Sequence, residues 1–266
     1  MTNEADKVKI GGSFVTDSSV NHSGKLTAGT MEISGDFTQN SSKSSYNFAA
    51  SGSHKVTFTS DKKHVVSVSS QNASYFNKLD ITGAEIELKY DTYLKNELIG
   101  EDGVITGKTI VICNNAKVPD VINGNVEIYG NYTLAKNVQI KGSLYLYDSQ
   151  LDLSGYTLTV EGDTSVDSAT VNMNNGIYNS NGNFSIGYYS RLNIVNSEET
   201  LNVQGNFSFL NPYNYNSQIT SGKINIKGNC VIDSGYFRPS GENEIIFSGE
   251  KKQCPCNLVR RVPVAN

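Results

Sequence analysis

Short stretches of alternating apolar and polar residues recur along the chain, and each stretch ends in a glycine. The repeated phrase is an apolar residue, any residue, a β-branched residue, any residue, Gly, a small polar residue and an apolar or aromatic one. Alternation with a period of two predicts a strand with one apolar face. The glycine and the polar residue after it indicate a bend. Clear copies are Val8–Phe14, Met31–Phe37, Val126–Tyr132, Leu201–Phe207 and Ile224–Cys230.

The apolar position two residues before the glycine is expected to face the interior of the fold. The aromatic residues that follow the glycine are expected to stack inside, and Asn side chains at turns to hydrogen-bond with one another from copy to copy. The glycine itself marks a place where a Cβ atom would clash. The interior residues predicted in this way are Ile10, Ile33, Phe58, Ile81, Ile105, Ile128, Val203, Ile226 and Phe247, with Phe14, Phe37, Tyr132, Phe184 and Phe207 as the aromatic stack.

The copies follow one another at a period of about 23 residues, in the range of solenoid repeats. The regular spacing runs from Gly12 to Gly35, continues through Gly83, Gly107 and Gly130, and returns from Gly182 to Gly249. Between residues 130 and 182 several partial copies overlap, and the register stays open. A strand at this period, with no helical segment long enough for crossovers, predicts an all-β, single-stranded parallel β-helix of about 10–11 coils. A sandwich of short antiparallel strands is the alternative.

A longer similarity joins two distant parts of the chain. Residues Phe48–His64 align without gaps to Phe237–Gln253. Such a duplication is typical of a module inside a tandem array. We expect a β-solenoid over residues 1–253, followed at 254–266 by a tail, a cap or a truncated module.

The phrases Ile33–Phe37, Ser51–Phe58 and Ser74–Leu79 resemble modules of large, repetitive surface and secreted proteins of bacteria, especially Gram-positive ones. More loosely, the chain is similar to the β-helical repeats of filamentous-haemagglutinin-type adhesins. The resemblance covers residues 8–253, and its motifs are scaffold motifs without catalytic residues; Cys254–Asn266 departs from the pattern. It implies a non-enzymatic rigid spacer or adhesive rod, at the cell surface or outside the cell, within a longer secreted chain.

Composition and charge narrow the possible functions. Only 18% of the residues are charged, the net charge is −4, and Asn and Ser are abundant. Coiled coils and helical bundles are excluded by this composition, and the negative charge makes nucleic-acid binding a poor expectation. No apolar run is long enough for a membrane span. The first residues lack the features of a signal peptide, which fits a protein that stays inside the cell or an interior segment of a secreted chain.

The cysteines and histidines do not predict a metal or cofactor site. Cys113 and Cys230 stand alone in apolar stretches, as buried small hydrophobic residues do. The Cys254-Pro-Cys256 pair has no second pair or nearby His to complete a zinc site. The three histidines, His22, His54 and His64, lack ligand spacing, and the internal copy has Asn243 in place of His54.

The alternative to a structural role is an enzyme that cleaves carbohydrates, a polysaccharide lyase or a glycosidase. Its candidate groups are the acidic residues of one stretch, although solvated turn positions explain them more simply and no Arg lies nearby in the sequence. These acidic residues are Asp148, Asp152, Glu161, Asp163 and Asp167.

A second alternative to a structural spacer or adhesin is a scaffold that assembles end to end through uncapped solenoid edges.

Two segments rich in Tyr and Asn are candidate contact surfaces. Tyrosine rings stack on sugars or proteins and their hydroxyls form hydrogen bonds, while neighbouring amides add polar contacts. A simple loop insertion between coils is the other interpretation. We therefore expect any contact with a glycan or a host or cell-surface protein to involve Tyr188, Tyr189, Tyr213 and Tyr215.

Overall fold

The structure, a computed structural model, describes residues 1–211 and 218–249, and its regular elements there are all β-strands. The strands pair in parallel and build a β-solenoid of about 11 turns, which confirms the predicted fold class. The chain divides into two compact units. The first contains Met1–Tyr129 and Ile140–Gly142, and the second contains Gly130–Gln139 and the residues from Ser143 on.

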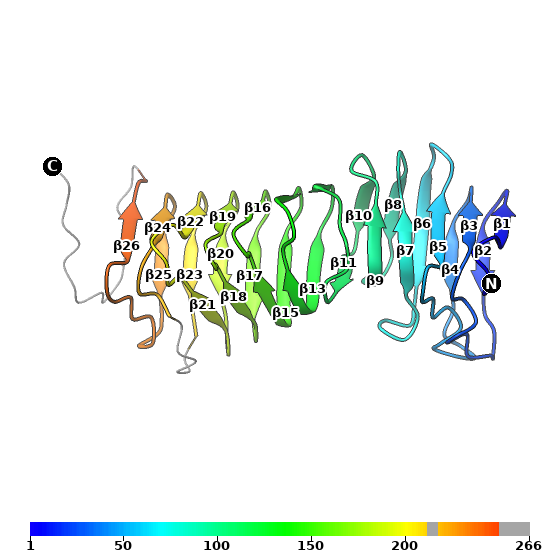
Figure 1. The fold of residues 1–266 in the computed structure, drawn as a ribbon, viewed down its shortest axis with the longest axis horizontal. Coiled ribbons are helices and arrows are strands. Elements are labelled where there is room, and N and C mark those ends of the chain that lie inside the picture. The colour runs from blue at the N-terminus through cyan, green and yellow to red at the C-terminus, as the bar shows by residue number, and fades with distance from the viewer. Residues whose placement is uncertain (212–217, 250–266) are drawn as a thin grey trace. The chain divides into compact units, whose positions relative to one another are not determined.

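In the first unit the chain alternates between two parallel sheets, because each predicted strand is followed by a corner and a second short strand. Successive strands of a sheet therefore belong to successive coils (Figure 1). One sheet contains β1 (Lys7–Ile10), β3 (Thr30–Ile33), β5 (Lys55–Phe58), β7 (Phe76–Asp80), β9 (Thr92–Ile99), β11 (Ile110–Cys113) and the start of β13 (Val126–Thr133). The other contains β2 (Phe14–Thr16), β4 (Phe37–Gln39), β6 (Lys63–Val68), β8 (Glu85–Leu88) and β10 (Val104–Gly107).

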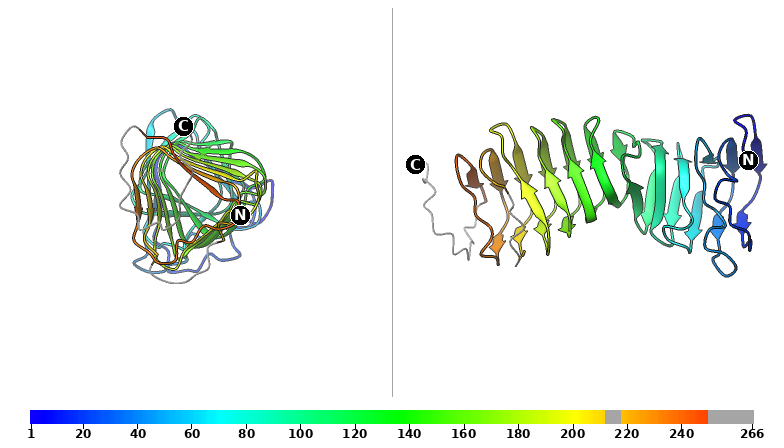
Figure 2. Two further views of the ribbon diagram at one scale, coloured as in Figure 1. Left: turned by 90° about the vertical axis from the view of Figure 1, so that its left-hand side faces the viewer. Right: turned by 60° about the horizontal axis from the view of Figure 1, so that its bottom comes forward.

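The second unit repeats this arrangement and adds a short third face, formed by β18 (Thr170–Asn172) and β21 (Arg191–Asn193). Figure 2 shows its successive strands side by side. One sheet contains β15 (Leu144–Asp152), β17 (Thr164–Asp167), β20 (Phe184–Ile186), β23 (Phe207–Phe209) and β25 (Cys230–Ile232). The other contains β14 (Val138–Ile140) up to Gln139, β16 (Thr157–Val160), β19 (Ile177–Ser180), β22 (Thr200–Val203), β24 (Lys223–Ile226) and β26 (Glu244–Phe247). The short strand β12 (Val121–Ile122) belongs to the first unit.

The length of a coil differs along the chain. Lys7 pairs with Thr30, and Phe207 with Cys230, which are the steps that the sequence predicts. Between β9 and β13 the partners, such as Thr92 and Ile110, are closer in sequence, because the turns that join the strands are shorter there. In the stretch whose register stayed open, Thr164 pairs with both Leu144 and Phe184. These two steps are equal, and they are also shorter than the predicted period.

The shorter coils correct the predicted phase of one copy of the phrase. The sequence spacing puts Gly83 and Gly107 at the same corner of consecutive coils. In the structure, Gly107 instead ends β10 and pairs with Leu88 of β8. The step from Gly83 to Gly107 is longer than a coil in this region, so counting by a fixed period skips to the next strand.

The predicted interior positions form the core. The residues two before the glycine are buried except Ile10 and Phe247, which lie on the edge strands β1 and β26. The aromatic residues form two clusters rather than one stack. In the first unit the Phe37 ring lies 4.7 Å from that of Phe48, and in the second Phe184 and Phe207 stack with centroids 6.1 Å apart.

The corner glycines are required by the coil before them. A Cβ atom on Gly35 would lie 2.5 Å from the carbonyl carbon of Gly12, and one on Gly205 would lie 2.5 Å from the carbonyl oxygen of Gly182. Neither Gly35 nor Gly205 has a positive φ, so the close backbone approach, not the conformation, demands glycine. The expectation that a Cβ atom would clash at this position is confirmed at Gly35 and Gly205, whereas a Cβ atom on Gly12 would meet no atom within 4 Å and one on Gly83 would meet only Asp102 Oδ2, at 3.9 Å.

The described part of the second duplicated segment, Phe237–Gly249, has the same local structure as Phe48–Ser60. Strand β26 begins and ends at the residues that align with the first and last residues of β5. Gly52 and Gly241 adopt φ values of 62° and 64°, and each would push a Cβ atom into a threonine carbonyl of the preceding coil, Thr27 or Thr220. The two segments are therefore equivalent coils of one repeating array.

Asn side chains connect neighbouring coils, as predicted, although one of the ladders lies on strands rather than at turns. Asn202 donates from Nδ2 to Oδ1 of Asn179 at 2.8 Å, and Asn225 donates to Asn202 at 2.7 Å. At the corners, the backbone N–H of Asn206 donates to Oδ1 of Asn183 at 2.9 Å, and that of Asn229 to Asn206 at the same distance. These bonds use polar groups on the outside of the solenoid to hold coils together.

Candidate functional site

Tyr188 and Tyr189 lie at the corner that follows β20. They are 55% and 46% exposed, and Tyr189 has a left-handed backbone conformation with φ of 57°. The next residue, Ser190, is buried and donates from Oγ to the Val166 carbonyl at 3.1 Å. The structure therefore presents both rings to solvent from an anchored corner. The other two predicted contact residues, Tyr213 and Tyr215, lie outside the described residues.

Two carboxylates of the acidic stretch, those of Glu161 and Asp163, are bound to neighbouring coils. Glu161 accepts a hydrogen bond from Gln139 Nε2 and another from Asn181 Nδ2, both at 2.6 Å. Asp163 accepts from the backbone N–H of Asn183 at 2.8 Å and from its Nδ2 at 3.0 Å. Because each partner lies one coil away, the carboxylates act as links between one coil and the next.

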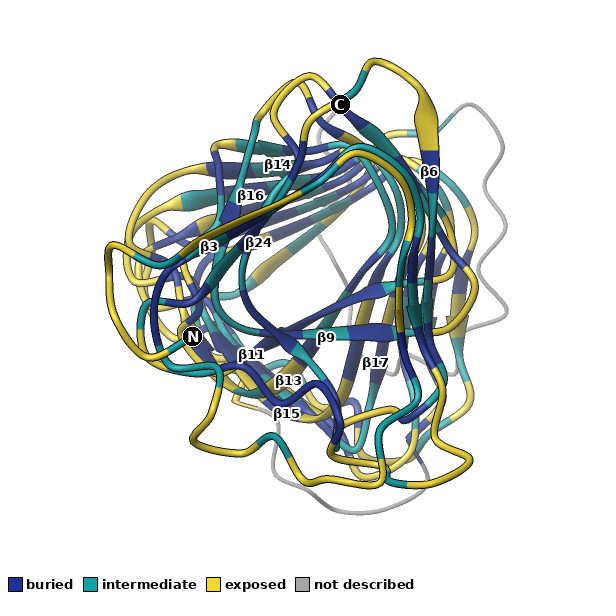
Figure 3. Ribbon diagram, turned by 90° about the vertical axis from the view of Figure 1, so that its right-hand side faces the viewer, coloured by how far each residue is buried: buried dark blue, intermediate teal, exposed yellow. Residues whose placement is uncertain are grey.

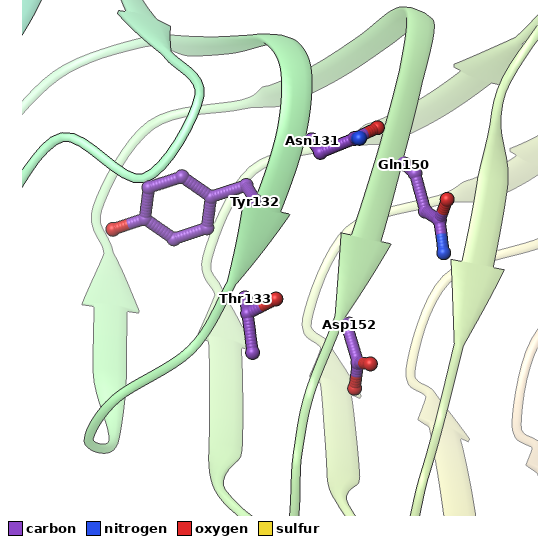
Figure 4. Close-up of a pocket in the computed structure, with 5 residues that line it drawn as sticks. All are labelled: Asn131, Tyr132, Thr133, Gln150 and Asp152. Carbon is purple, nitrogen blue, oxygen red and sulfur yellow. The ribbon is translucent and has the colours of Figure 1, made fainter.

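Asp152 of the same stretch lines a pocket of about 170 Å³ in the second unit (Figure 4). Its carboxylate accepts hydrogen bonds from Asn174 Nδ2 at 2.7 Å and from the Ser154 N–H at 2.8 Å. Asn131 and Gln150 lie across the same pocket on exposed positions, and no hydrogen bond to either side chain occurs within residues 1–211 and 218–249. Amide groups of this kind can donate to and accept from a polar ligand, but they supply no general base or nucleophile.

An aromatic cluster on the first unit was not predicted from the sequence. The Lys95 ammonium lies 4.9 Å from the centroid of the Tyr75 ring and 5.6 Å from that of Tyr93, and it donates to Asn72 Oδ1 at 3.3 Å. Tyr93 in turn contacts Tyr129 edge to face, at 5.9 Å between centroids. The three tyrosines do not follow the period of the repeated phrase. Only the true coil register, which is shorter here than that period, brings them together.

Buried ionisable groups accompany this cluster. Cys113, on β11, is buried, and its burial raises the pKa of the thiol. Burial also raises the pKa of the neighbouring Glu127 carboxyl, with a further contribution from the charge of Asp91. Both effects favour the neutral forms, which makes the thiol a poor nucleophile. Cys113 and Cys230 are both buried, as predicted.

Within the part of the chain that the structure describes, no three His, Cys, Asp or Glu residues are placed to hold a metal ion. The Cys254–Cys256 pair lies outside that part. The described residues also contain no helix that is long and apolar enough to cross a bilayer. No family model matches the sequence, and neither the curated proteins nor the solved structures contain a match to it.

Proposed function

We propose that this chain is a structural segment of a bacterial extracellular repeat protein, a solenoid that spaces or displays other parts of a longer chain. The observation that carries this proposal is the use of its polar outer side chains. Asn202, Glu161 and Asp163 each hydrogen-bond to the neighbouring coil. A surface whose polar groups serve the stacking of coils suits a structural element.

The same observation speaks against the enzyme alternative. A glycosidase needs two carboxyl groups that face each other across the bond to be cleaved. Here the Glu161 and Asp163 carboxylates each accept two hydrogen bonds from groups of adjacent coils. These bonds occupy both oxygens of Glu161 and Oδ1 of Asp163, so the two carboxylates already serve the contact between coils.

The duplicated coil gives further support. Gly52 and Gly241 occupy equivalent corners, so the same unit of structure recurs along the chain. Solenoids of repeated coils gain length by adding units that contact only their neighbours. Such a design fits a spacer, because the function of a spacer is to set the distance between the parts of the chain on either side of it.

Activity assays test the structural proposal against the enzyme alternative. The purified chain is incubated with a panel of acidic and neutral polysaccharides, and new reducing ends and new carbon–carbon double bonds are measured. We expect no product above a heat-denatured control. Product formation that disappears in the folded variants Glu161→Gln or Asp163→Asn would overturn the proposal in favour of a carbohydrate-active enzyme.

Force spectroscopy tests the spacer role directly. The full chain is pulled from its two ends between folded reference domains. We expect it to resist extension at forces comparable to those of the reference domains and then to unfold in coil-sized steps. Extension at forces near zero would contradict a role as a rigid spacer.

A second candidate function, adhesion, is favoured by the exposed pair Tyr188 and Tyr189. The buried Ser190 hydroxyl anchors their corner, which limits the entropy lost on binding. The ligand class that fits two exposed tyrosine rings is a glycan or a polar protein surface. A glycan array probed with the wild-type chain and with Tyr188→Ala/Tyr189→Ala tests this role, and binding that survives the double substitution would contradict it.

A further inference from the structure

The N-terminal coil has an uncovered face. Strands β1 and β2 are the edge strands of their sheets. Val8 of β1 is 38% exposed, whereas the residue that pairs with it in the next coil, Met31, is buried. Phe14 of β2 is half-buried, whereas its partner Phe37 is fully buried.

The residues before β1 do not cover this face. The N-terminal ammonium of Met1 donates to the Lys25 carbonyl at 3.1 Å, and the Met1 carbonyl accepts from the Thr27 N–H at 2.9 Å. Both partners belong to the loop that leads into the second coil, so the chain start folds back toward that coil. Figure 3 looks onto the N-terminal end of the chain. There β1 and β2 are the last strands of their sheets, so each has one edge without a partner strand among the described residues.

The free space around Gly12 indicates what could pack on this face. A Cβ atom on Gly35 would collide with Gly12, but a Cβ atom on Gly12 would meet no atom within 4 Å. Corner glycines such as Gly35, Gly205 and Gly228 make room for the coil before them, whereas no coil precedes Gly12 among the described residues. Its glycine is explained if another coil stacks on this face.

The internal repeat shows how the same phrase is covered elsewhere. Val8–Phe14 corresponds to Leu201–Phe207, where β22 pairs with β19 on its N-terminal side. There Gly205 lies against the Gly182 carbonyl, at the position equivalent to Gly12. A coil with this phrase is therefore able to accept a preceding parallel strand without change.

We propose that the face of β1 and β2 binds strand β26 of a second copy of this chain. Strand β26 is an edge strand, and its Phe247 is 42% exposed although it occupies an interior position. Continuing the register places Glu244 of one copy beside Lys7 of the next, and Phe247 beside Ile10. The same charge pattern already operates between coils, where Lys223 and Glu244 form an ion pair at 3.5 Å.

This contact joins two different surfaces of the molecule, the β26 edge and the β1 edge. Such a heterologous contact repeats from copy to copy and gives an open chain of molecules rather than a closed dimer. A parallel strand added to a free sheet edge satisfies unpaired backbone N–H and C=O groups. The interior apolar residues of both end coils become buried in the same step.

Sedimentation at rising concentration tests the proposal with a matched pair of variants. Gly12→Ala adds a methyl group that meets nothing in the single chain but that collides with a docked coil. Gly11→Ala is the control, because Gly11 is also free of neighbours and other coils carry side chains at its position, Ser34 and Gln204. We expect wild type and Gly11→Ala to associate and Gly12→Ala to require at least tenfold higher concentration.

Equal association of the two glycine variants would overturn the proposal, as would a wild-type chain that stays monomeric at every concentration. A crosslinking experiment tests the partner strand in a background with Cys254→Ser and Cys256→Ser. The register places Lys9 beside Ile246, so Lys9→Cys mixed with Ile246→Cys is expected to give a disulfide-linked dimer of the two variants. A dimer of Lys9→Cys with itself would instead show that two β1 edges meet, and would refute the head-to-tail contact.

Discussion

His54 provides a sharp test of how the core of the first unit is built. Its ring is completely buried and lies 6.0 Å from that of Phe48, and neither ring nitrogen has a hydrogen-bond partner. Burial, with a smaller contribution from the positive N-terminus, lowers the pKa of His54 to about 4. A buried imidazole without partners must stay neutral for the coil to remain stacked.

The magnitude follows from the difference in pKa between the folded and unfolded chain. An unfolded histidine has a pKa of 6.5, so the difference from about 4 is roughly 2.5 pH units, or about 3 kcal/mol. The unfolded chain binds the proton below pH 6.5, whereas the folded chain binds it only below about pH 4. The contribution of His54 to stability is therefore complete above pH 6.5, falls as the pH drops to 4 and is constant below that.

The informative substitution is His54→Asn, because the internal copy has Asn243 at the equivalent position. Asn243 donates from Nδ2 to the carbonyls of Ser221 and Gly222, at 2.7 and 3.2 Å. In the next coil Asn77 donates to the Gly52 carbonyl at 2.8 Å. An amide at position 54 is thus expected to find backbone acceptors that the imidazole does not use, and it does not titrate.

Urea unfolding of the wild type and His54→Asn between pH 7.5 and 4 measures the effect. Protonation of carboxylates lowers the stability of both proteins, so the quantity of interest is the difference between their free energies of unfolding. We expect that difference to move in favour of the variant by about 3 kcal/mol from pH 7.5 to pH 4. Curves that stay parallel over this range would refute the reasoning that His54 is buried and neutral.

Three further predictions concern other parts of the solenoid. Tyr178→Phe removes the 2.9 Å hydrogen bond between the buried Tyr178 hydroxyl and Thr164 Oγ1, and we expect a loss of about 1–2 kcal/mol that the added Thr164→Val largely restores, as measured by thermal unfolding. Gly205→Ala forces a methyl group against the Gly182 carbonyl and should cost about 1–3 kcal/mol; an unchanged melting temperature would contradict the corner geometry. Burial raises the pKa of the Cys230 thiol to about 11 and raises that of Cys113, so in a Cys254→Ser/Cys256→Ser variant both thiols should react with a thiol reagent at pH 8 only after unfolding.

The fold was predictable because its repeating phrase combines two independent signals. Alternation identifies the interior face, as at Ile33 and Val203, which are buried. Corner glycines such as Gly205 mark each bend, because backbone contact between coils excludes a side chain there. Together with the period they predict a parallel solenoid, although short strands at regular spacing also left an antiparallel sandwich as the alternative.

The coil register of the middle region was less predictable. Strand pairing tolerates turns of different length, so the distance between Thr92 and its partner Ile110 is not set by the period of the rest of the chain. The aromatic cluster around Lys95 depends on that register and therefore escaped sequence analysis. Tyr188 was predictable as an exposed ring, since loops rich in Asn and Tyr lie at the surface. The residue pattern does not predict whether a ligand binds this ring or which one.

The corner glycines give the solenoid a direction. Gly35, Gly205 and Gly228 make room for the coil on their N-terminal side, whereas Gly12, with no described coil before it, would place a Cβ atom against no atom of the coil that follows. Removing whole coils from the N-terminal side should therefore free one glycine from its constraint and create no new clash. The backbone of a coil added there would pack directly against Gly12. A coil added after β26 would instead need a corner glycine of its own. Deletions can thus shorten this array from its N-terminal side by complete coils without compensating substitutions.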